Sequence, residues 1–379
     1  MVYREFTEDK LKISQLGFGC MRFPTIKQGD KDIIDEAEAI KMIHHGIENG
    51  INYYDTAFFY HGGESETLLG KALSGGYREK VYIADKFPIG RAINENSMEE
   101  TLDGQLKKLQ TDYVDCYMLH GIGKKDIPKI KEFNLLKKAE ELKEKGKIKH
   151  FGFSFHDNFE ALKELLSIYD KWEFCQIQYN YLDEYNQATT EGLKLLHEKG
   201  IYVIIMEPLR GGALSNVPEN VRQTLDSVDK ERSSTNWALS WLFDKKEISI
   251  ILSGMSSMEQ LKENIEIANN ANIDCFSDKM RETVKNAYAE YEKRIKVGCT
   301  DCKYCMPCPK GVDIPFNFRL LNNDYKLTLD PKNNWQYNQE QNKEKNASNC
   351  IGCKACEPKC PQKIKVSDEL KAMSAIYAR

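Results

Sequence analysis

Four polar side chains fall at or just beyond the ends of short apolar runs: Asp55, Tyr60, Lys86 and His120. Reduction of a carbonyl group needs a hydride on one side and a proton on the other. Tyrosine is a poor acid near neutral pH unless its surroundings tune it, and a lysine held by a carboxylate would stabilise the tyrosinate. A histidine can orient the substrate oxygen and relay a proton. If the fold brings these four side chains into one cleft, they could perform acid–base catalysis.

Eight of the twelve cysteines lie in two short runs near the C-terminal end of the sequence. In a cytosolic chain, clustered cysteines indicate metal binding rather than disulfides. The first run is Cys299, Cys302, Cys305 and Cys308, and the second is Cys350, Cys353, Cys356 and Cys360. The second run has the spacing of bacterial [4Fe–4S] ferredoxins, and the first is one residue shorter before its last cysteine.

We therefore predict two [4Fe–4S] clusters with crossed ligation, because the fourth cysteine of each run binds the other cluster in two-cluster ferredoxins. Cys299, Cys302, Cys305 and Cys360 would bind one cluster, and Cys350, Cys353, Cys356 and Cys308 the other. A pair of zinc sites is the alternative, since zinc is also held by four thiolates. Zinc modules more often separate two Cys-x-x-Cys pairs, so four cysteines in one run favour iron–sulfur clusters. A helix-like stretch at 314–326 predicts a partly helical module.

Short apolar strands alternate with amphipathic helix-like segments, and these elements must position the four polar side chains. Eight strands are predicted, at residues 16–20, 51–55, 81–86, 113–119, 147–153, 174–178, 201–205 and 248–252. Gly50, Gly146 and Gly200 follow three of the helical segments and suit a helix stop. Eight βα units predict an α/β fold, a (β/α)8 TIM barrel with its active site at the C-terminal ends of the strands. A doubly wound sheet is the alternative, but the strand count and the lack of a Gly-x-Gly-x-x-Gly loop favour the barrel.

The chain of 379 residues suits one large domain and a smaller one. We expect a barrel at 1–296 and a ferredoxin-like domain at 297–379, with a hairpin at 2–13 and a helix at 278–296. The net charge of −4 and the pI of about 6.1 offer no basic field to nucleic acid. No apolar signal segment or membrane-length stretch is present, so we expect a soluble, cytoplasmic protein without a membrane partner.

From about residue 16 to residue 268, the sequence resembles the aldo-keto reductases. The matching pieces include Gly17-Phe-Gly19-Cys-Met-Arg, Asp55-Thr-Ala-x-x-Tyr60, Lys86, Asp112-Tyr-Val-Asp-Cys-Tyr-Met-Leu-His120, Gln176-Ile-Gln-Tyr-Asn180 and Glu207-Pro-Leu-Arg-Gly-Gly212. The resemblance implies that Asp55, Tyr60, Lys86 and His120 form a catalytic tetrad. Tyr60 would be the general acid, Lys86 and Asp55 would tune it, and His120 would orient the substrate.

The resemblance also implies a nicotinamide cofactor, NADPH or NADH. Ser154 and Gln176 match residues that hold the carboxamide, although Phe155 stands where the family usually has an asparagine. Met206 aligns with the aromatic residue that stacks on the nicotinamide, and its soft apolar side chain could still pack on the ring.

The nucleotide end of the implied cofactor site is less complete. Gly254 and Gln260 align with basic residues that often bind the 2′-phosphate, whereas Glu263 and Asn264 match the adenine contacts. Because positions 254 and 260 carry no positive charge, the expectation that the protein prefers NADPH to NADH is weakened. A barrel that has lost its cofactor is the alternative.

Fused chains of this kind resemble an aldo-keto reductase subgroup common in anaerobic bacteria. We expect an oxidoreductase that interconverts a small carbonyl compound and an alcohol, with clusters that exchange electrons with a ferredoxin, flavodoxin or flavoprotein. Two alternatives remain: the clusters only brace the fold, or the barrel is a scaffold in an electron-transfer or redox-sensing protein. The sequence carries no readable code for the substrate.

Overall fold

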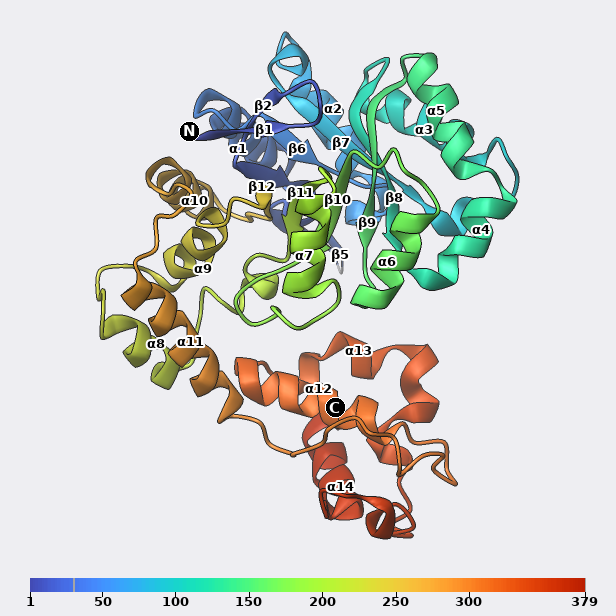
Figure 1. Ribbon diagram of the computed structural model, residues 1–379, viewed down its shortest axis with the longest axis vertical. Helices are drawn as coiled ribbons and strands as arrows, with labels where there is room; N and C mark the ends of the chain where they lie inside the picture. The colour runs from blue at the N-terminus through green and yellow to red at the C-terminus, as the bar shows by residue number, and fades with distance from the viewer. Residues whose placement is uncertain (30, 379) are drawn as a thin grey trace. The chain divides into compact units, whose positions relative to one another are not determined.

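The computed structural model describes residues 1–29 and 31–378 (Figure 1). The chain divides into two compact units. The first comprises Met1–Leu214 and Thr235–Asp278, and the second comprises Ser215–Ser234 and the chain from Lys279 onward. This division concerns compactness, and the domain boundary at residue 297 stays a prediction. None of the helices in the described residues is long and apolar enough to cross a membrane.

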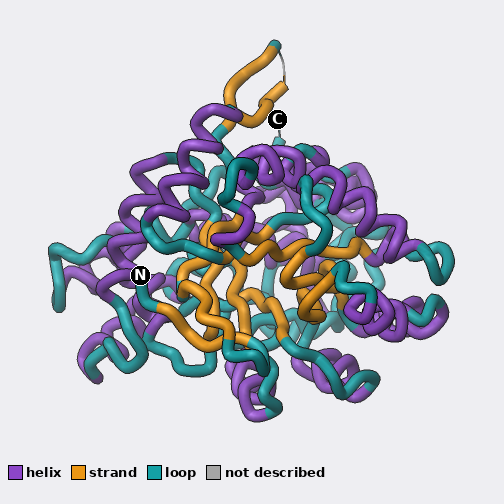
Figure 2. The backbone as a smooth tube through the Cα atoms, turned by 90° about the horizontal axis from the view of Figure 1, so that it is seen from above, coloured by secondary structure: helices purple, strands orange, loops and turns teal. Residues whose placement is uncertain are grey.

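Eight parallel strands close into a barrel at the centre of the first unit (Figure 2). They are β3 (Leu16–Gly19), β6 (Tyr53–Asp55), β7 (Tyr82–Pro88), β8 (Val114–Ile122), β9 (Ile148–Phe155), β10 (Phe174–Gln178), β11 (Tyr202–Met206) and β12 (Ile248–Ser253). They follow one another around the barrel in chain order, and β12 pairs with β3. Each strand lies where the sequence predicted one, so the (β/α)8 prediction is confirmed.

Helices cover the outside of this barrel (Figure 1). They are α1 (Glu36–Glu48), α2 (Ser65–Leu73), α3 (Ser97–Leu109), α4 (Ile127–Glu132), α5 (Leu135–Glu144), α6 (Phe159–Ser167), α7 (Thr189–Glu198), α9 (Ser234–Phe243) and α10 (Met258–Asn270). Gly50, Gly146 and Gly200 have φ values of +91°, +73° and +72°, which glycine adopts without strain after a helix. The three predicted helix stops are therefore confirmed.

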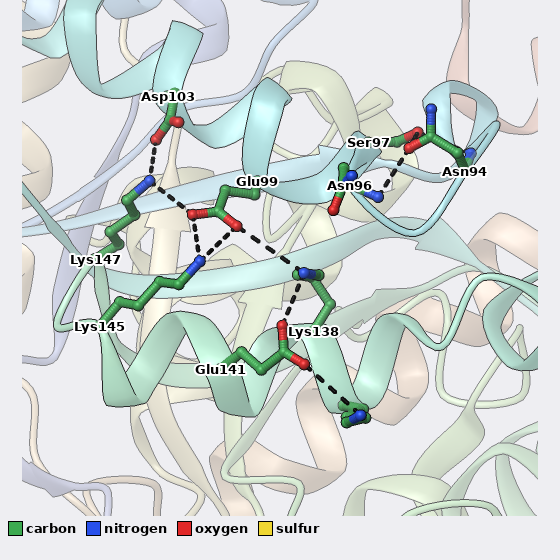
Figure 3. Close-up of polar contacts among 10 residues, drawn as sticks. Asn94, Asn96, Ser97, Glu99, Asp103, Lys138, Glu141, Lys145 and Lys147 are labelled. Atoms are coloured by element: carbon green, nitrogen blue, oxygen red, sulfur yellow. Dashed lines mark hydrogen bonds and ion pairs between the residues drawn. The ribbon is translucent and has the colours of Figure 1, made fainter.

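Ion pairs connect α3 with α5 and with the start of β9 (Figure 3). Glu99 on α3 accepts hydrogen bonds from Lys145 at 2.7 Å and from Lys147 at 2.9 Å. Lys147 also donates to Asp103, one turn further along α3, at 2.6 Å. These contacts hold neighbouring elements of the outer layer together.

The N-terminal hairpin of β1 (Tyr3–Phe6) and β2 (Leu11–Ser14) was predicted, and it closes one end of the barrel. Phe6 is fully buried and packs on Tyr53 and Phe174, the first residues of β6 and β10. The predicted tetrad residues lie at the opposite end of the barrel, at the C-terminal ends of the strands. A second hairpin, β4 (Thr25–Gln28) and β5 (Lys31–Ile34), was not predicted and stands apart from the barrel in Figure 2.

The second unit is helical in its described residues. It contains α8 (Glu219–Asp226), α11 (Asp278–Glu292), α12 (Ile314–Leu327), α13 (Trp335–Asn338) and α14 (Val366–Tyr377). Asp313 caps α12 by accepting a hydrogen bond from the Phe316 backbone nitrogen at 3.1 Å. The helix predicted at 278–296 ends earlier, at Glu292, whereas the helix predicted at 314–326 is present.

Candidate functional sites

Parallel strands bring Asp55, Lys86 and His120 to the same end of the barrel. Asp55 is the last residue of β6, Lys86 lies near the end of β7, and Tyr60 begins the turn that follows β6. His120 was expected just beyond its strand, but it lies within β8, because the strand continues past this polar residue. The pairing of β8 with β9 is irregular between Leu119 and Ile122, and such a break can re-aim a side chain.

The Lys86 ammonium is the centre of the site. It donates to Asp55 Oδ1 at 2.5 Å, to the Thr56 carbonyl at 2.8 Å and to Tyr60 Oη at 3.3 Å. An ammonium has three donors, so these contacts fix its position. Lys86 and Asp55 are only 1% and 2% exposed, which keeps water away from the ion pair.

Burial and charge set the protonation of the tetrad. Burial alone would lower the pKa of Lys86, but Asp55 and Tyr60 outweigh it, so its pKa is raised and the ammonium stays charged. Burial raises the pKa of Tyr60, and the Lys86 charge opposes that rise, so Tyr60 keeps its proton near neutral pH. Burial, followed by the Lys86 charge, lowers the pKa of His120 to about 3, so its ring is neutral.

The phenol of Tyr60 lies between the lysine and the histidine. The ring centroids of Tyr60 and His120 are 6.2 Å apart at 83°, and both side chains are half-buried. The protonated phenol and the neutral imidazole therefore lie next to each other, and Lys86 and Asp55 are more deeply buried than either. The structure brings all four predicted tetrad residues together.

Ser154 and Gln176 lie side by side on β9 and β10, next to the tetrad. They pair in register, and Gln176 Nε2 lies 3.4 Å from Asp55 Oδ2. Ser154 Oγ accepts a hydrogen bond from the Gly121 backbone nitrogen at 2.9 Å. Phe155 is fully buried and offers no polar group to a carboxamide. Met206 ends β11, in register with Gln178, and is half-buried.

The other predicted cofactor residues lie at the junction of β12 and α10. Asn264 is buried and donates to Ser253 Oγ at 2.9 Å. Gln260 is exposed, and its Oε1 accepts from the Ser256 backbone nitrogen at 2.8 Å, while Glu263 is half-buried. Gly254 has no side chain here, and the junction also carries the N-terminal end of α10, where free backbone N–H groups suit a phosphate group.

Arg22 is a candidate that sequence reasoning missed. A Cβ atom added to Gly254 would lie 2.9 Å from Arg22 Cγ and 3.1 Å from Arg22 Cβ. One added to Gly211, on the turn after β11, would lie 3.6 Å from Arg22 Nη2. The exposed guanidinium thus extends from Gly254 toward Gly211, and glycine at both positions leaves room for it. The only signal in the sequence is a cation shortly after the first barrel strand.

Two cavities lie among the cysteine loops of the second unit. Cys299, Cys302, Cys305 and Cys360 line the smaller cavity, of about 330 Å³ including space open to solvent. Cys308, Cys350, Cys353 and Cys356 line the larger one, of about 510 Å³, and Cys305 also reaches it. Each cavity therefore combines cysteines from both runs.

The donor set and the cavities fit clusters held by four surrounding thiolates. The four thiolates of a [4Fe–4S] cluster surround a cluster-sized space, whereas the ligands of a single metal ion meet at one point. Among the described residues, no three His, Cys, Asp or Glu side chains converge to hold a single metal ion.

Comparisons of sequence identify two families along the chain. The Aldo/keto reductase family matches residues 15–285, and the 4Fe-4S dicluster domain matches residues 298–365. An uncharacterized oxidoreductase of Bacillus subtilis, YqkF, is 29% identical over 299 residues, covering 70% of this chain and 90% of that protein. The NADH-specific methylglyoxal reductase of Escherichia coli is 27% identical over 319 residues, covering 72% of this chain and 95% of that protein.

Comparison of structures finds the same fold in solved proteins. The holo form of aldo-keto reductase AKR11C1 from Bacillus halodurans has a TM-score of 0.63 and 28% identity, covering 76% of this chain and 96% of that one. An aldo-keto reductase from Klebsiella pneumoniae in complex with NADPH has a TM-score of 0.62 and 20% identity, covering 76% and 96%. The similarity to the second protein concerns the fold alone.

Proposed function

Because this chain belongs to the aldo/keto reductase family, we propose that it interconverts a small carbonyl compound and an alcohol with a nicotinamide cofactor. The observation that carries the proposal is the Lys86 ammonium, which contacts both Asp55 and Tyr60 Oη in a buried site. Such an arrangement can donate a proton to a carbonyl oxygen and stabilise the tyrosinate that remains.

Each tetrad residue has a separate role in this proposal. Tyr60 donates the proton, since burial raises its pKa and keeps the phenol protonated. Lys86 stabilises the phenolate electrostatically, and Asp55 holds Lys86 in place. Because burial lowers the pKa of His120, its imidazole is neutral. It orients the substrate oxygen by a hydrogen bond and carries no charge.

We propose that Ser154 and Gln176 hold the nicotinamide carboxamide and that Met206 packs on its ring. The bound cofactor would supply the hydride. Glu263 and Asn264 would contact the adenine, and Gly254 and Gln260 would lie near the 2′-phosphate. The family membership and the NADH-specific relative support a nicotinamide cofactor, NADH or NADPH.

Arg22 would supply the cation that is missing at positions 254 and 260. Its side chain lies against Gly254, beside the N-terminal end of α10. A guanidinium and the free N–H groups of a helix end both favour phosphate oxygens. Arg22 would thus provide the positive charge for the 2′-phosphate that Gly254 and Gln260 lack.

We also propose two [4Fe–4S] clusters with crossed ligation in the domain at 297–379. Cys299, Cys302, Cys305 and Cys360 would hold one, and Cys308, Cys350, Cys353 and Cys356 the other. The match to a dicluster domain and the two cavities support this assignment. The clusters would pass electrons one at a time, so their partner would be a one-electron carrier such as a ferredoxin, flavodoxin or flavoprotein.

Replacement of Tyr60 tests the proposal. Tyr60→Phe removes the phenolic proton and keeps the ring, so turnover of a small aldehyde should fall roughly a hundredfold or more. Tyr185→Phe, at an exposed tyrosine after β10, is the matched control and should retain full turnover. Turnover of Tyr60→Phe within about twofold of the wild type would exclude the role, on the scale expected for general acid catalysis. Nucleotide binding without any aldehyde turnover would favour the scaffold alternative.

A further inference from the structure

A second group of buried polar side chains lies behind Lys86, on the other face of β7. Successive residues of a strand point to opposite faces, so Asp85 points away from the barrel interior that Lys86 occupies. Asp85 pairs in register with Tyr117 on β8. Glu66 on α2 and Gln105 on α3 complete the group. Asp85, Tyr117 and Glu66 are fully buried, and Gln105 is 1% exposed.

This group holds the backbone of Lys86 at both of its polar atoms. The Lys86 backbone nitrogen donates to Asp85 Oδ1 at 2.8 Å, and Gln105 Nε2 donates to the Lys86 backbone carbonyl at 3.1 Å. Gln105 is itself fixed, because its Nε2 also donates to Glu66 Oε1 at 2.9 Å and its Oε1 accepts from Tyr117 at 2.7 Å. The position of the lysine therefore depends on contacts outside the barrel as well as on Asp55 and Tyr60.

The charges in this group do not balance if both carboxyls are ionised. Lys108 on α3 donates to Glu66 Oε2 at 2.9 Å and neutralises that carboxylate. The Lys86 ammonium is already engaged with Asp55, inside the barrel. Asp85 Oδ2 has no hydrogen-bond donor among the residues that the structure describes. If ionised, Asp85 would be a buried carboxylate without a counter-ion, which is strongly unfavourable.

A proton on Asp85 resolves both problems at once. Both carboxyls are tied to Lys86: Asp85 Oδ1 accepts from its backbone nitrogen, and Gln105 Nε2 donates both to its carbonyl and to Glu66 Oε1. Glu66 also acts on Asp85 as a side-chain hydrogen-bond partner. A protonated Asp85 can donate to Glu66, which satisfies the orphaned oxygen and removes one negative charge. Consistent with this, burial and then the Glu66 charge raise the pKa of Asp85 well above its ordinary value.

We propose that Asp85 and Glu66 share one buried proton and that this carboxyl pair positions Lys86 for catalysis from outside the barrel wall. Lys108 and Gln105 on α3 contact Glu66, and the Lys86 backbone nitrogen on β7 contacts Asp85. Tyr117 on β8 donates to Gln105, and the charge of Asp103 on α3 acts on Tyr117. Loss of the proton places two carboxylates against each other and loosens the end of β7 that carries the lysine. The shared proton does not depend on the proposed function, whereas the effect of the carboxyl pair on turnover does.

Carbon-13 NMR of the full-length protein, labelled at the aspartate side-chain carboxyls, tests the proton directly. Asp85→Asn assigns the resonance of Asp85 by its disappearance. We expect this carboxyl to be protonated at neutral pH and to titrate only on the alkaline side. Ionisation near pH 4, the ordinary range for aspartate, would overturn the proposal whether or not the protein reduces carbonyls.

Kinetics test the positioning role. Asp85→Asn keeps a donor toward Glu66 but cannot ionise, so kcat should stay within about threefold at neutral pH and its alkaline decline should move to higher pH, where Tyr60 titrates. Asp85→Leu removes both hydrogen bonds, and kcat should fall about tenfold at every pH with unchanged nucleotide affinity. Glu64→Gln, at an exposed acid near the start of α2, is the matched control. An Asp85→Asn profile that superimposes on the wild type would overturn the role, even if Asp85→Leu does not fold.

Discussion

At the scale of single residues, the proposed chemistry depends on the three hydrogen bonds that the Lys86 ammonium donates. Lys86 contacts Asp55, Thr56 and Tyr60, and only the first and last of these were predicted from sequence. The backbone carbonyl of Thr56 was not foreseeable, because residue types do not show where a carbonyl points. Arg22 was missed for a related reason: its side chain packs where a side chain at position 254 would lie, and the two residues come together only in the fold.

Arg22 gives the first prediction, which concerns nucleotide binding. A charge-assisted bond to phosphate contributes about 1.5–3 kcal/mol, so Arg22→Ala should weaken NADPH binding about tenfold or more and NADH binding less. Adding Gly254→Lys to that variant should restore much of the NADPH affinity, because it returns a cation to the same space. Calorimetric titration measures both ligands. Equal losses for the two nucleotides would assign Arg22 to their common diphosphate, and no loss would exclude it from the site.

At the scale of elements, strand ends and helix contacts place the tetrad. The predicted ends of β7 and β8 were too early, because a polar residue was read as the end of each strand. Lys86 and His120 stay in strands that are paired on both sides, so hydrogen-bonded strand backbone carries both of these proposed catalytic groups. The β4–β5 hairpin escaped prediction because its strands are short and mostly exposed, without the apolar alternation of a core strand.

The ion pairs of Figure 3 give a prediction on stability. Hydrogen bonds from Lys145 and then Lys147 lower the pKa of Glu99 from 4.5 to about 2. This lowered pKa stabilises the fold above pH 4.5, and the stabilisation is lost as the pH falls toward 2. For a partly exposed group, Glu99→Gln should cost about 1 kcal/mol at neutral pH, or about 2–4 °C in Tm.

The deficit of Glu99→Gln should shrink near pH 3, where Glu99 is almost fully protonated in the unfolded chain but still mostly ionised in the folded protein. Calorimetry of the barrel transition at both pH values measures it. Glu100→Gln, the next residue and an exposed one, is the control and should change Tm little. A deficit that is equal at both pH values would show that the charge of Glu99 contributes nothing.

At the scale of the whole molecule, the chain joins a reductase barrel to an iron–sulfur domain. The eight strands and eight cysteines were predictable because each signal is local: apolar runs of strand length, and cysteines at fixed spacing. The carboxyl pair of Asp85 and Glu66 was not, since it joins a strand to a helix that packs on it. Phe155 and Gly254 marked departures from the family pattern in the sequence, but only the fold showed Arg22 lying against Gly254.

Crossed ligation can be tested by pairing cysteine substitutions. The reconstituted protein should hold about eight irons and eight sulfides, and Cys308→Ser with Cys353→Ser should leave about four of each, since both act on one cluster. Cys308→Ser with Cys302→Ser should remove both clusters. Cys275→Ser, outside both runs, is the control. If ligation is not crossed, the metal contents of the two double variants will be exchanged: the Cys308/Cys353 variant will lose both clusters and the Cys308/Cys302 variant will keep one. About two zincs per chain and no sulfide would show zinc sites in place of the clusters.

The most direct test of the central claim follows a labelled hydrogen from the nucleotide to the product. The anaerobically prepared full-length protein is given a small aldehyde and NADH or NADPH carrying deuterium at the nicotinamide C4 position. We predict one deuterium on the carbinol carbon of the alcohol, transferred from one face of the nicotinamide only, and no such product from Tyr60→Phe on the same timescale. Alcohol that forms without label, or only when reduced clusters supply the electrons, would contradict a nicotinamide-dependent reductase centred on Tyr60.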